Sequence, residues 1–564
     1  MAKKVIVLGG GVAGMSAAHE LCERGFAVEI YEYKSIPGGK ARSIEVPGSA
    51  SQGKKMLPGE HGFRFFPGFY KHVTDTMKRI PIPAQNKSVF ENLVPTSRME
   101  IARFDNKDVV LLSKCPTSRE DLKILVASLA GGNFNLTTEE IEFFSARMWQ
   151  LLTSCKERRL DEYEKIGWWE YLEADRFSVH YQKLLVEGLT RTLVAAQAKL
   201  ANTKTGGDIL LQLIFDMFKI GSSSDRVLNG PTNEVWIGPW LTYLQSKGVT
   251  YHLNSKVEVI NCDHEKVRSV HISKNGKMQE VQGDHYISAL PVEVLAKLLT
   301  PEMLLIDPSL ATISQLKEQV AWMNGMQFYL REDIPIVNGH VIYIDSPWSL
   351  TSISQKQFWN NVKLNEYGDG TVKGVLSVDI SDWDTAGIIH NKPAKQCSVE
   401  EIREEVWAQL KKSQNHNGTE ILKDENVHSF FLDSDIFYPG PHESVNLEPL
   451  LVNLANSWHL RPNAYCRIPN LFLASDYIKT NTDLATMEGA NEAARRAVNC
   501  ILSVEKAKTG FCKIWDLHEP SIFAIWRRQD YKRFQQGLPW KGDFNKIILI
   551  IQRIRLFFFF KWGL

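Results

Sequence analysis

Residues 3–32 read KKVIVLGGGVAGMSAAHELCERGFAVEIYE, and this stretch decides the fold class. The apolar run at 5–8 predicts a buried strand that leads directly into a glycine-rich turn. Apolar residues at helical spacing follow, and Gly25 marks the end of the predicted helix. A second apolar run at 27–31 predicts another strand. Together these elements predict the βαβ unit of a Rossmann-like α/β domain.

Three glycines and one acidic residue complete a dinucleotide-binding fingerprint in this unit. Gly9 permits a tight turn, Gly11 lets the backbone approach a pyrophosphate, and Gly14 lets the helix pack closely on the strand. The helix N-terminus faces the phosphate charge. Glu32 stands 18 positions after Gly14, where a carboxylate accepts hydrogen bonds from ribose hydroxyls. The predicted contacts of this fingerprint are Gly9, Gly11, Val12, Ala13, Gly14 and Glu32.

The residues after the second strand indicate which dinucleotide binds. Residues 38–42, GGKAR, resemble the GG(R/K)xR segment of flavin amine oxidases and carotenoid desaturases. In that superfamily the segment lies beside the FAD diphosphate and ribityl chain, and its second basic residue helps to neutralise the phosphate charge. The resemblance implies a glutathione-reductase-type domain that binds FAD, with contacts from Gly39, Lys40 and Arg42.

The far end of the chain carries a second motif of the same superfamily. Residues 468–497 resemble the carotenoid desaturase motif NLFLAGDYT…SMEGA, although Ser475 replaces a glycine and the SG that usually follows MEGA is absent. The resemblance implies that Asp476 hydrogen-bonds the ribityl chain. It also implies that the backbone near Met487 and Glu488 lies against the isoalloxazine, where a helix dipole stabilises reduced flavin.

Two central segments complete the expected FAD domain. Residues 230–260 resemble the family segment whose last strand places a backbone group, here near Val257, on the adenine. Residues 284–299 resemble the strand, turn and helix that return to the FAD domain. We therefore expect a discontinuous FAD domain with an inserted α+β substrate domain. The expected FAD domain comprises residues 1–95, 226–300 and 455–503.

The remaining segments are expected to cover the flavin. Residues 96–225 are helix-rich by pattern, with a capping-box start at Thr137 or Thr138. Residues 301–454 mix strands with a helix at 399–412. Most large aromatic side chains of these regions are interpreted as core, and a minority as the wall of an apolar substrate tunnel. They are Trp168, Trp169, Trp236, Trp240, Trp322, Phe328 and Tyr329.

Residues 59–70, GEHGFRFFPGFY, resemble the carotenoid desaturase pattern (D/E)xGxHxxFGxY, which passes near the flavin ring. Glu60 and Gly62 fit the pattern, whereas Arg64 occupies a position where the family has histidine. We therefore expect Gly62 to contact the cofactor. His61 is the candidate proton acceptor, and Arg64 is the candidate stabiliser of anionic flavin or of a substrate oxygen. Structural hydrogen bonding by both residues is the alternative interpretation.

The overall composition excludes several classes of protein. A net charge of +1 over 564 residues argues against a dedicated nucleic-acid binder. Eight scattered cysteines without a CxxC pair indicate reduced thiols in a cytoplasmic protein and predict no metal site. The chain begins with a strand rather than an apolar signal helix, so we expect no signal peptide. The single nucleotide fingerprint indicates that the flavin is reoxidised by a quinone or oxygen rather than reduced by NAD(P)H.

The segment 504–564 forms a basic, apolar tail. Residues 521–564 contain nine lysines and arginines and only two aspartates. The last residues are strongly apolar but are interrupted by Gln552, Arg553 and Arg555, so no membrane-spanning helix is expected. An amphipathic stripe from 547 to 558 predicts a helix lying on a membrane surface. Docking on the protein's own core or on a second subunit is the alternative.

The superfamily resemblance implies an FAD-dependent oxidoreductase. The leading hypothesis is a desaturase or dehydrogenase of an isoprenoid or another hydrophobic molecule, close to the phytoene desaturase-like and hydroxysqualene dehydroxylase-like enzymes. A flavin amine oxidase is the first alternative, although the strand 322–330 lacks the lysine common in those enzymes. A flavin-dependent isomerase or dehydroxylase of isoprenoids is the second. A non-catalytic membrane flavoprotein scaffold is the third.

Overall fold

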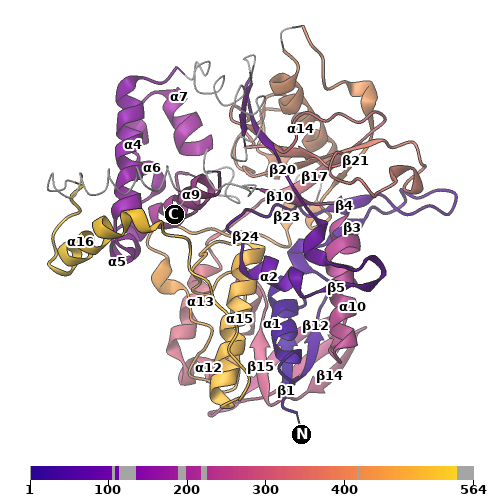
Figure 1. The fold of residues 1–564 in the computed structure, drawn as a ribbon. Helices are drawn as coiled ribbons and strands as arrows, with labels where there is room; N and C mark the ends of the chain where they lie inside the picture. The colour runs from indigo at the N-terminus through magenta and orange to yellow at the C-terminus, as the bar shows by residue number, and fades with distance from the viewer. Residues whose placement is uncertain are drawn as a thin grey trace.

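Figure 1 shows a parallel sheet with its helices near the N-terminus, a large mixed sheet above it and a helical layer to one side. The two sheets are assembled from interleaved segments of the chain, whereas the helices of the layer follow one another between residues 138 and 217. The computed structural model describes residues 2–104, 108–112, 135–188, 198–217, 225–416, 418–440 and 443–542.

Five parallel strands form the centre of the first group. Their order is β11–β2–β1–β15–β25, and every neighbouring pair is parallel. Parallel sheets are covered on both faces, which explains the uninterrupted apolar sequence VIVL of the central strand β1. The bounds are β1 Lys4–Leu8, β2 Ala27–Tyr31, β11 Thr250–His252, β15 His285–Ser288 and β25 Leu471–Leu473. This is the Rossmann-like arrangement that the sequence predicts.

Two helices from opposite ends of the chain pack against each other beside this sheet. Helix α1 (Val12–Cys22) follows β1, and helix α15 (Met487–Val504) begins shortly after β25 (Figure 1). The first and last motifs of the sequence therefore lie together. The other main elements of this group are α2 His72–Lys78, α10 Gly238–Ser246, β12 Ser255–Cys262, β13 Val267–Lys274, β14 Lys277–Val281 and α11 Val292–Leu298.

A seven-stranded mixed sheet forms the second group. Its order is β21–β17–β20–β19–β18–β8–β9, and only the β18–β8 pair is parallel. Helix α14 (Val399–Gln414) packs on this sheet through Trp407, whose ring centroid lies 4.8 Å from that of Phe328. The bounds are β8 Arg98–Ala102, β9 Val109–Leu112, β17 Asn324–Leu330, β18 His340–Tyr343, β19 Thr351–Ser354, β20 Gly374–Ile380 and β21 Val427–Leu432.

The start of segment 96–225 differs from the helical prediction. Strands β8 and β9 lie there, and β8 extends the mixed sheet by pairing with β18, for example Ile101 with Ile342. The short run RMEIA carries too little periodicity to separate strand from helix, so pairing with a distant strand decides its conformation. The sheet expected only from residues 301–454 therefore begins before residue 104.

The helical layer follows the predicted pattern more closely. Helix α4 (Thr138–Thr153) begins at the N-cap Thr137, whose hydroxyl accepts the Glu140 N–H at 3.2 Å, which confirms the predicted capping box. Its other helices are α5 Lys156–Asp161, α6 Trp168–Tyr171, α7 Val179–Tyr181, the π-helix Gln182–Gly188 and α9 Thr203–Met217.

Shorter elements join the three groups. They are β3 Ser43–Glu45, β4 Pro58–Glu60, β5 Pro81–Ile82, β6 Lys87–Ser88, β7 Leu93–Pro95, β10 Arg226–Leu228, α12 Pro301–Ile306, α13 Thr312–Leu316, β16 Val320–Ala321, β22 Ile436–Gly440, β23 Glu443–Asn446 and β24 Leu450–Leu451.

The described part of the C-terminal tail docks on the protein itself. Helix α16 (Ala524–Gln535) presents the buried Asp530, which accepts the Arg158 Nε–H at 2.9 Å and the Cys155 N–H at 2.8 Å. The tail therefore packs on α5. The amphipathic helix predicted at 547–558 lies outside the described residues. Among the helices that the structure describes, none is both long and apolar enough to cross a membrane.

Candidate active site

A cavity of about 490 Å³ lies between the two sheets, and both sheets contribute to its wall. One end is formed by the turns that follow the parallel strands, and the other by strands of the mixed sheet. Most of the predicted site residues line it. These are Gly9, Gly11, Val12, Ala13, Glu32, Gly39, Lys40, His61, Gly62, Arg64, Val257, Asp476 and Met487.

Two of the three fingerprint glycines, Gly9 and Gly14, stand where a side chain has no room. Gly9 has a positive φ of 101°, and a Cβ there would lie 2.8 Å from the carbonyl oxygen of Ala289. A Cβ on Gly14 would lie 2.0 Å from the carbonyl oxygen of Gly9. Gly14 therefore supports the turn from behind and does not line the cavity. Gly11 faces the cavity, where its backbone is open to a phosphate.

Glu32 stands at the end of β2 with its carboxylate in the cavity wall. It accepts the Gly10 N–H at 2.8 Å and the Lys34 N–H at 2.9 Å. Burial raises the pKa of Glu32, and these two N–H groups oppose the rise. The carboxylate thus fixes the glycine turn and retains acceptor capacity for a ribose hydroxyl.

We predict that Glu32→Gln weakens FAD binding by roughly tenfold or more, because an amide nitrogen accepts neither the Gly10 N–H nor a ribose hydroxyl. Titration of the FAD-stripped protein with FAD measures the change. Glu29→Gln is the matched control, because Glu29 lies on the same strand, pairs with Lys4 and is absent from the cavity wall. Equal affinities of both variants would contradict the assigned role.

The segment 38–42 lies against the glycine turn, but Arg42 does not reach the cavity. A Cβ on Gly39 would lie 2.8 Å from the Cα of Gly11, so the two backbones are in close contact. The buried Arg42 guanidinium donates to Glu448 Oε2 at 2.7 Å and to Asp435. Two buried carboxylates thus bind the cation that the family resemblance assigns to the diphosphate. The direct contact of Arg42 with FAD stays a prediction.

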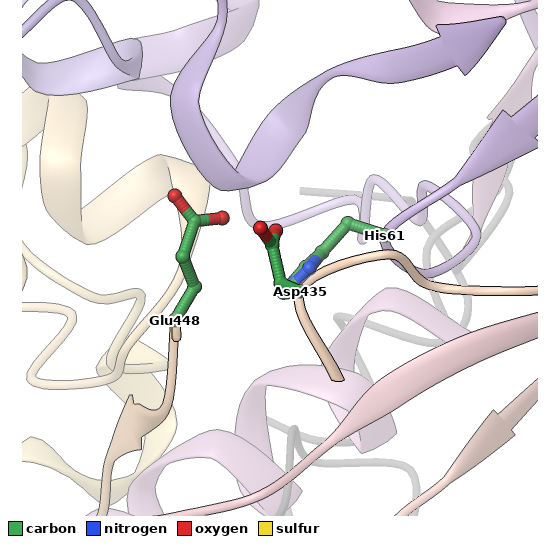
Figure 2. A group of neighbouring side chains, drawn as sticks. All are labelled: His61, Asp435 and Glu448. Carbon is green, nitrogen blue, oxygen red and sulfur yellow. The ribbon is translucent and has the colours of Figure 1, made fainter. Parts of the chain in front are cut away.

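Figure 2 shows His61, Asp435 and Glu448 turned toward one another. One ligand atom from each lies within 4.8 Å of the others, which is a spacing that a metal ion accepts. Arg42 already binds both carboxylates, and the Lys34 ammonium lies 2.9 Å from Asp435 Oδ1. Two cations therefore balance the two carboxylates, which favours an ion-pair cluster over a metal centre.

The two candidate catalytic residues line the cavity from the loop after β4. His61 Nδ1 lies 2.7 Å from Asp433 Oδ2, and both side chains are buried. Arg64 Nη2 donates to the carbonyl oxygen of Lys40 at 2.6 Å. Burial lowers the pKa of Arg64, although the nearby Glu60 and other carboxylates oppose this. The loop thus places both candidates in the cavity wall, and their catalytic roles stay predictions.

Helix α15 begins at the cavity, and its first residues divide their roles. Thr486 caps the helix by accepting the Gly489 N–H at 3.2 Å, and Met487 lines the cavity. The Glu488 side chain turns away and accepts the His72 N–H at 2.8 Å and the Val73 N–H at 2.9 Å. Glu488 therefore fastens α2 to α15, while only its backbone is available for the predicted flavin contact.

Sequence reasoning missed the polar residues that the mixed sheet contributes. His340 on β18, Thr351 on β19 and Asp379 on β20 line the cavity from adjacent strands. The sequence offered one sign of this, because Asp379 is a single carboxylate within the otherwise apolar strand GVLSVDI. In contrast, none of the seven large aromatic residues weighed as core or tunnel lines this cavity. Trp168, Trp236, Trp240, Phe328 and Tyr329 are fully buried in the cores.

The family model described as flavin containing amine oxidoreductase matches residues 12–502. The chain belongs to the flavin-containing amine oxidoreductases. The family resemblance predicted from the sequence is thereby confirmed, as are the FAD cofactor and the assignment as an FAD-dependent oxidoreductase. FAD fits the observed site, because the crowded glycine turn, the acidic end of β2 and the capped start of α15 all meet at one cavity.

Relatives of this flavin-containing amine oxidoreductase include carotenoid desaturases. The 15-cis-phytoene desaturase of Synechococcus elongatus is 24% identical over 65% of this chain and 70% of its own length. The zeta-carotene desaturase of Synechocystis sp. is 22% identical over 89% of this chain and 97% of its own length.

Solved structures support the fold assignment. The cyclohexylamine oxidase of Brevibacterium oxydans has a TM-score of 0.58 at 11% identity, covering 90% of this chain and 100% of its own. Putrescine oxidase also has a TM-score of 0.58 at 11% identity, covering 89% of this chain and 99% of its own. At these identities the likeness concerns the fold alone, and it confirms the predicted Rossmann-like class with an added substrate domain.

Proposed function

We propose that this protein is an FAD-dependent desaturase or dehydrogenase of an isoprenoid or a similarly hydrophobic molecule. The observation that carries the proposal is the wall of the cavity beyond the cofactor segment. Phe63, Phe65 and Met323 line the cavity from outside segment 38–42 and supply apolar surface. Sequence similarity to phytoene and zeta-carotene desaturases supports the same substrate class.

The composition of the mixed sheet favours this proposal over an amine oxidase. Within the described residues, the strands of that sheet contribute no lysine to the cavity, and the lysines that line it are Lys40 and Lys256. Arg64 also faces the cavity, and its positive charge disfavours an ammonium substrate.

When bound, FAD supplies a two-electron hydride acceptor. The protein's own contribution is to hold the substrate carbon against the cofactor and to exclude water from a largely apolar chamber. A quinone or oxygen is the proposed acceptor that reoxidises the cofactor, because the sequence shows one nucleotide fingerprint only.

Anaerobic reduction of the bound cofactor by lipid extracts tests this proposal. The protein is purified in detergent, its FAD spectrum is recorded, and hydrophobic compounds and amines are added without oxygen. Bleaching by an isoprenoid-rich extract, with a product that carries one more double bond, is the expected result. Bleaching by polyamines with peroxide formed in air would instead identify an amine oxidase. Product formation without net electron transfer would identify an isomerase or dehydroxylase, and no response at all would leave a flavoprotein scaffold.

Peripheral membrane association through the tail is part of the proposal. We predict that the full chain sediments with vesicles containing anionic lipid and that a variant ending at Gly542 does not. Removal of the last residues deletes the basic and apolar helix predicted from the sequence. Retained FAD absorbance shows that the shortened variant is folded, and neutral vesicles serve as the control. Equal sedimentation of both proteins would contradict this role of the tail.

A further inference from the structure

A buried carboxyl group lies in the part of the cavity wall that the mixed sheet forms. Asp379 lies near the end of β20, opposite Thr351 of β19 and Gly325 of β17. Its residue is only 5% exposed, and it lines the cavity together with Thr351. Asp379 therefore belongs to the mixed sheet, which we expect to face the substrate, and not to segment 38–42.

The surroundings of Asp379 place it at the junction between the cofactor loop and the substrate space. A Cβ on Gly62 would lie 2.9 Å from Asp379 Oδ1, so the loop backbone lies directly against the carboxyl group. A Cβ on Gly325 would lie 2.8 Å from the Cα of Gly62. The loop can therefore lie this close to β17 only because residue 325 is glycine. Two glycines thus bring the loop and the floor together around one carboxylate.

One oxygen of this carboxyl group is without a partner. The Phe63 N–H lowers the pKa of the carboxyl group, whereas Oδ1 has no hydrogen-bond partner among the described residues. A buried acceptor left unpaired costs about 1–3 kcal/mol, so natural structures rarely retain one without a function. Since Oδ1 belongs to a residue of the cavity wall, it is free to accept a proton from a molecule bound in the cavity.

The electrostatic environment suits proton exchange near neutral pH. Burial raises the pKa of Asp379 to about 7, while Arg64 and the Phe63 N–H oppose the rise and the carboxylates Glu60 and Asp433 add to it. A carboxyl group of this kind is available in both protonation states at physiological pH. The charged and titratable groups around it are Glu60, Arg64 and Asp433, and His61 and His340 share its cavity.

The two histidines of the cavity are the other candidate acceptors. His61 Nδ1 lies 2.7 Å from Asp433 Oδ2, and its Nε2 has no hydrogen-bond partner among the described residues. His61 belongs to the loop after β4, beside the cluster around Arg42, whereas Asp379 stands on the mixed sheet opposite Thr351. Burial lowers the pKa of His340 to about 4, so its imidazole is a weak base. Of the groups that the mixed sheet contributes to the cavity, Asp379 is therefore the better base near neutral pH.

We propose that Asp379 accepts the proton that the substrate loses during dehydrogenation, an inference that rests on the proposed function. One C–H bond of the substrate breaks with its electron pair going to FAD as hydride. The C–H bond on the neighbouring carbon breaks with its proton going to Asp379 Oδ1, and its electron pair forms the new double bond. The substrate is oxidised by two electrons and the cofactor is reduced by two. Because positive charge develops on the first carbon, the neighbouring C–H becomes acidic enough for a carboxylate.

Asp379→Asn tests the assignment in the FAD-loaded protein. The variant keeps the size of the side chain but cannot accept the proton, so anaerobic cofactor reduction is expected to slow by roughly 10²- to 10⁴-fold while FAD is retained. The wild-type rate is expected to rise with pH through about 7, because the acceptor must be deprotonated, and the variant is expected to lose this rise. Asp379→Glu retains a carboxyl group and is expected to recover part of the rate together with the pH dependence.

Infrared titration of the carboxyl groups provides a second readout that needs no substrate. Burial raises the pKa of Glu60 and Glu100 to about 7 as well, so several carboxylic acid bands are expected to titrate near neutral pH in the wild type. One of these bands is expected to be lost in Asp379→Asn. Glu100→Gln is the matched control, because burial also raises the pKa of Glu100 to about 7, yet this residue of the same sheet accepts Gln414 Nε2–H and does not line the cavity. It is expected to lose a different band and keep the wild-type kinetics.

Three outcomes overturn the proposal in distinguishable ways. In the first, hydrophobic compounds reduce the FAD of the wild type, and Asp379→Asn shows the same rate and pH profile. This result would exclude Asp379 as the acceptor and leave the proposed function intact. In the second, no hydrophobic compound reduces the FAD of the wild type. This result would refute the proposed function and, with it, the role of Asp379. If Asp379→Asn loses FAD, the infrared titration of Asp379→Glu decides, because the new carboxyl group must shift the band of the acceptor. No change in any carboxylic acid band that titrates near neutral pH would exclude Asp379 as the acceptor.

Discussion

Replacement of Gly14 by alanine is expected to abolish FAD retention and to lower the free energy of unfolding by about 3 kcal/mol. The new Cβ would lie 2.0 Å from the carbonyl oxygen of Gly9 and 3.3 Å from Val7 Cγ1. The Gly9 oxygen belongs to the backbone of the dinucleotide turn and cannot rotate away as a side chain would. The clash is therefore relieved only if α1 moves away from β1. That movement displaces both the turn and the helix N-terminus that face the diphosphate.

Absorbance of the purified protein and thermal unfolding with added FAD measure the two effects. A ligand that binds only the folded state raises the melting temperature, so FAD is expected to stabilise the wild type and not Gly14→Ala. Gly510→Ala is the matched control, because a Cβ there meets no atom within 4 Å and the residue lacks a positive φ. Wild-type FAD content in Gly14→Ala would refute the packing role of this glycine.

The cofactor half of the site was predictable because its signals are local in sequence. The turn from Gly9 to Gly14 and the acidic end of β2 lie within one βαβ unit, where each residue type has a fixed steric or electrostatic task. The motif near Met487 was equally readable, because a helix start is encoded by the residues next to it. These segments meet at the cavity because neighbouring parallel strands end at the same edge of the sheet.

The substrate half was not predictable, since tertiary pairing determines it. Asp379 reaches the cavity through its strand neighbours, and its contact with the loop at Gly62 depends on the small size of Gly325. No local pattern encodes that contact. The same reason explains β8, whose sequence does not reveal that it pairs with β18.

The partners of buried side chains were also not predictable from the sequence. The sequence assigns Arg42 to the cofactor, but the partners it meets in the fold are carboxylates from the segment between β21 and β24. Glu488 likewise turns from the flavin position to α2. In both cases the motif places the backbone correctly, while a competing buried partner decides the direction of the side chain.

Arg42→Met is expected to lower the free energy of unfolding by about 3–5 kcal/mol at pH 7, because it leaves Glu448 and Asp435 without their main counter-ion. The guanidinium is 2% exposed, so water cannot replace it. Lys34 stays near both carboxylates, at 2.9 Å from Asp435 Oδ1 and 3.4 Å from Glu448 Oε1, but it balances only one charge. Chemical denaturation of wild type and variant measures the difference.

The pH dependence separates this charge effect from a loss of packing. Burial opposes ionisation of Glu448, but Arg42 and neighbouring cations hold its pKa below the ordinary value. A carboxyl group with a lowered folded-state pKa stabilises the fold above its unfolded-state pKa of about 4.3, and this stabilisation is lost as the pH falls. In Arg42→Met the lowering disappears and burial favours the protonated acid. The deficit is therefore expected to be largest near pH 7 and to shrink toward pH 4.

An exposed ion pair provides the control for this experiment. Arg268→Met removes the partner of Asp263 at the surface, where water screens the pair, and it is expected to unfold at the wild-type denaturant concentration at both pH values. A deficit in Arg42→Met that is equal at pH 7 and pH 4 would assign the effect to the lost volume of the side chain. A deficit that shrinks with acid would show that Arg42 acts as the counter-ion that keeps Glu448 charged in the cavity wall.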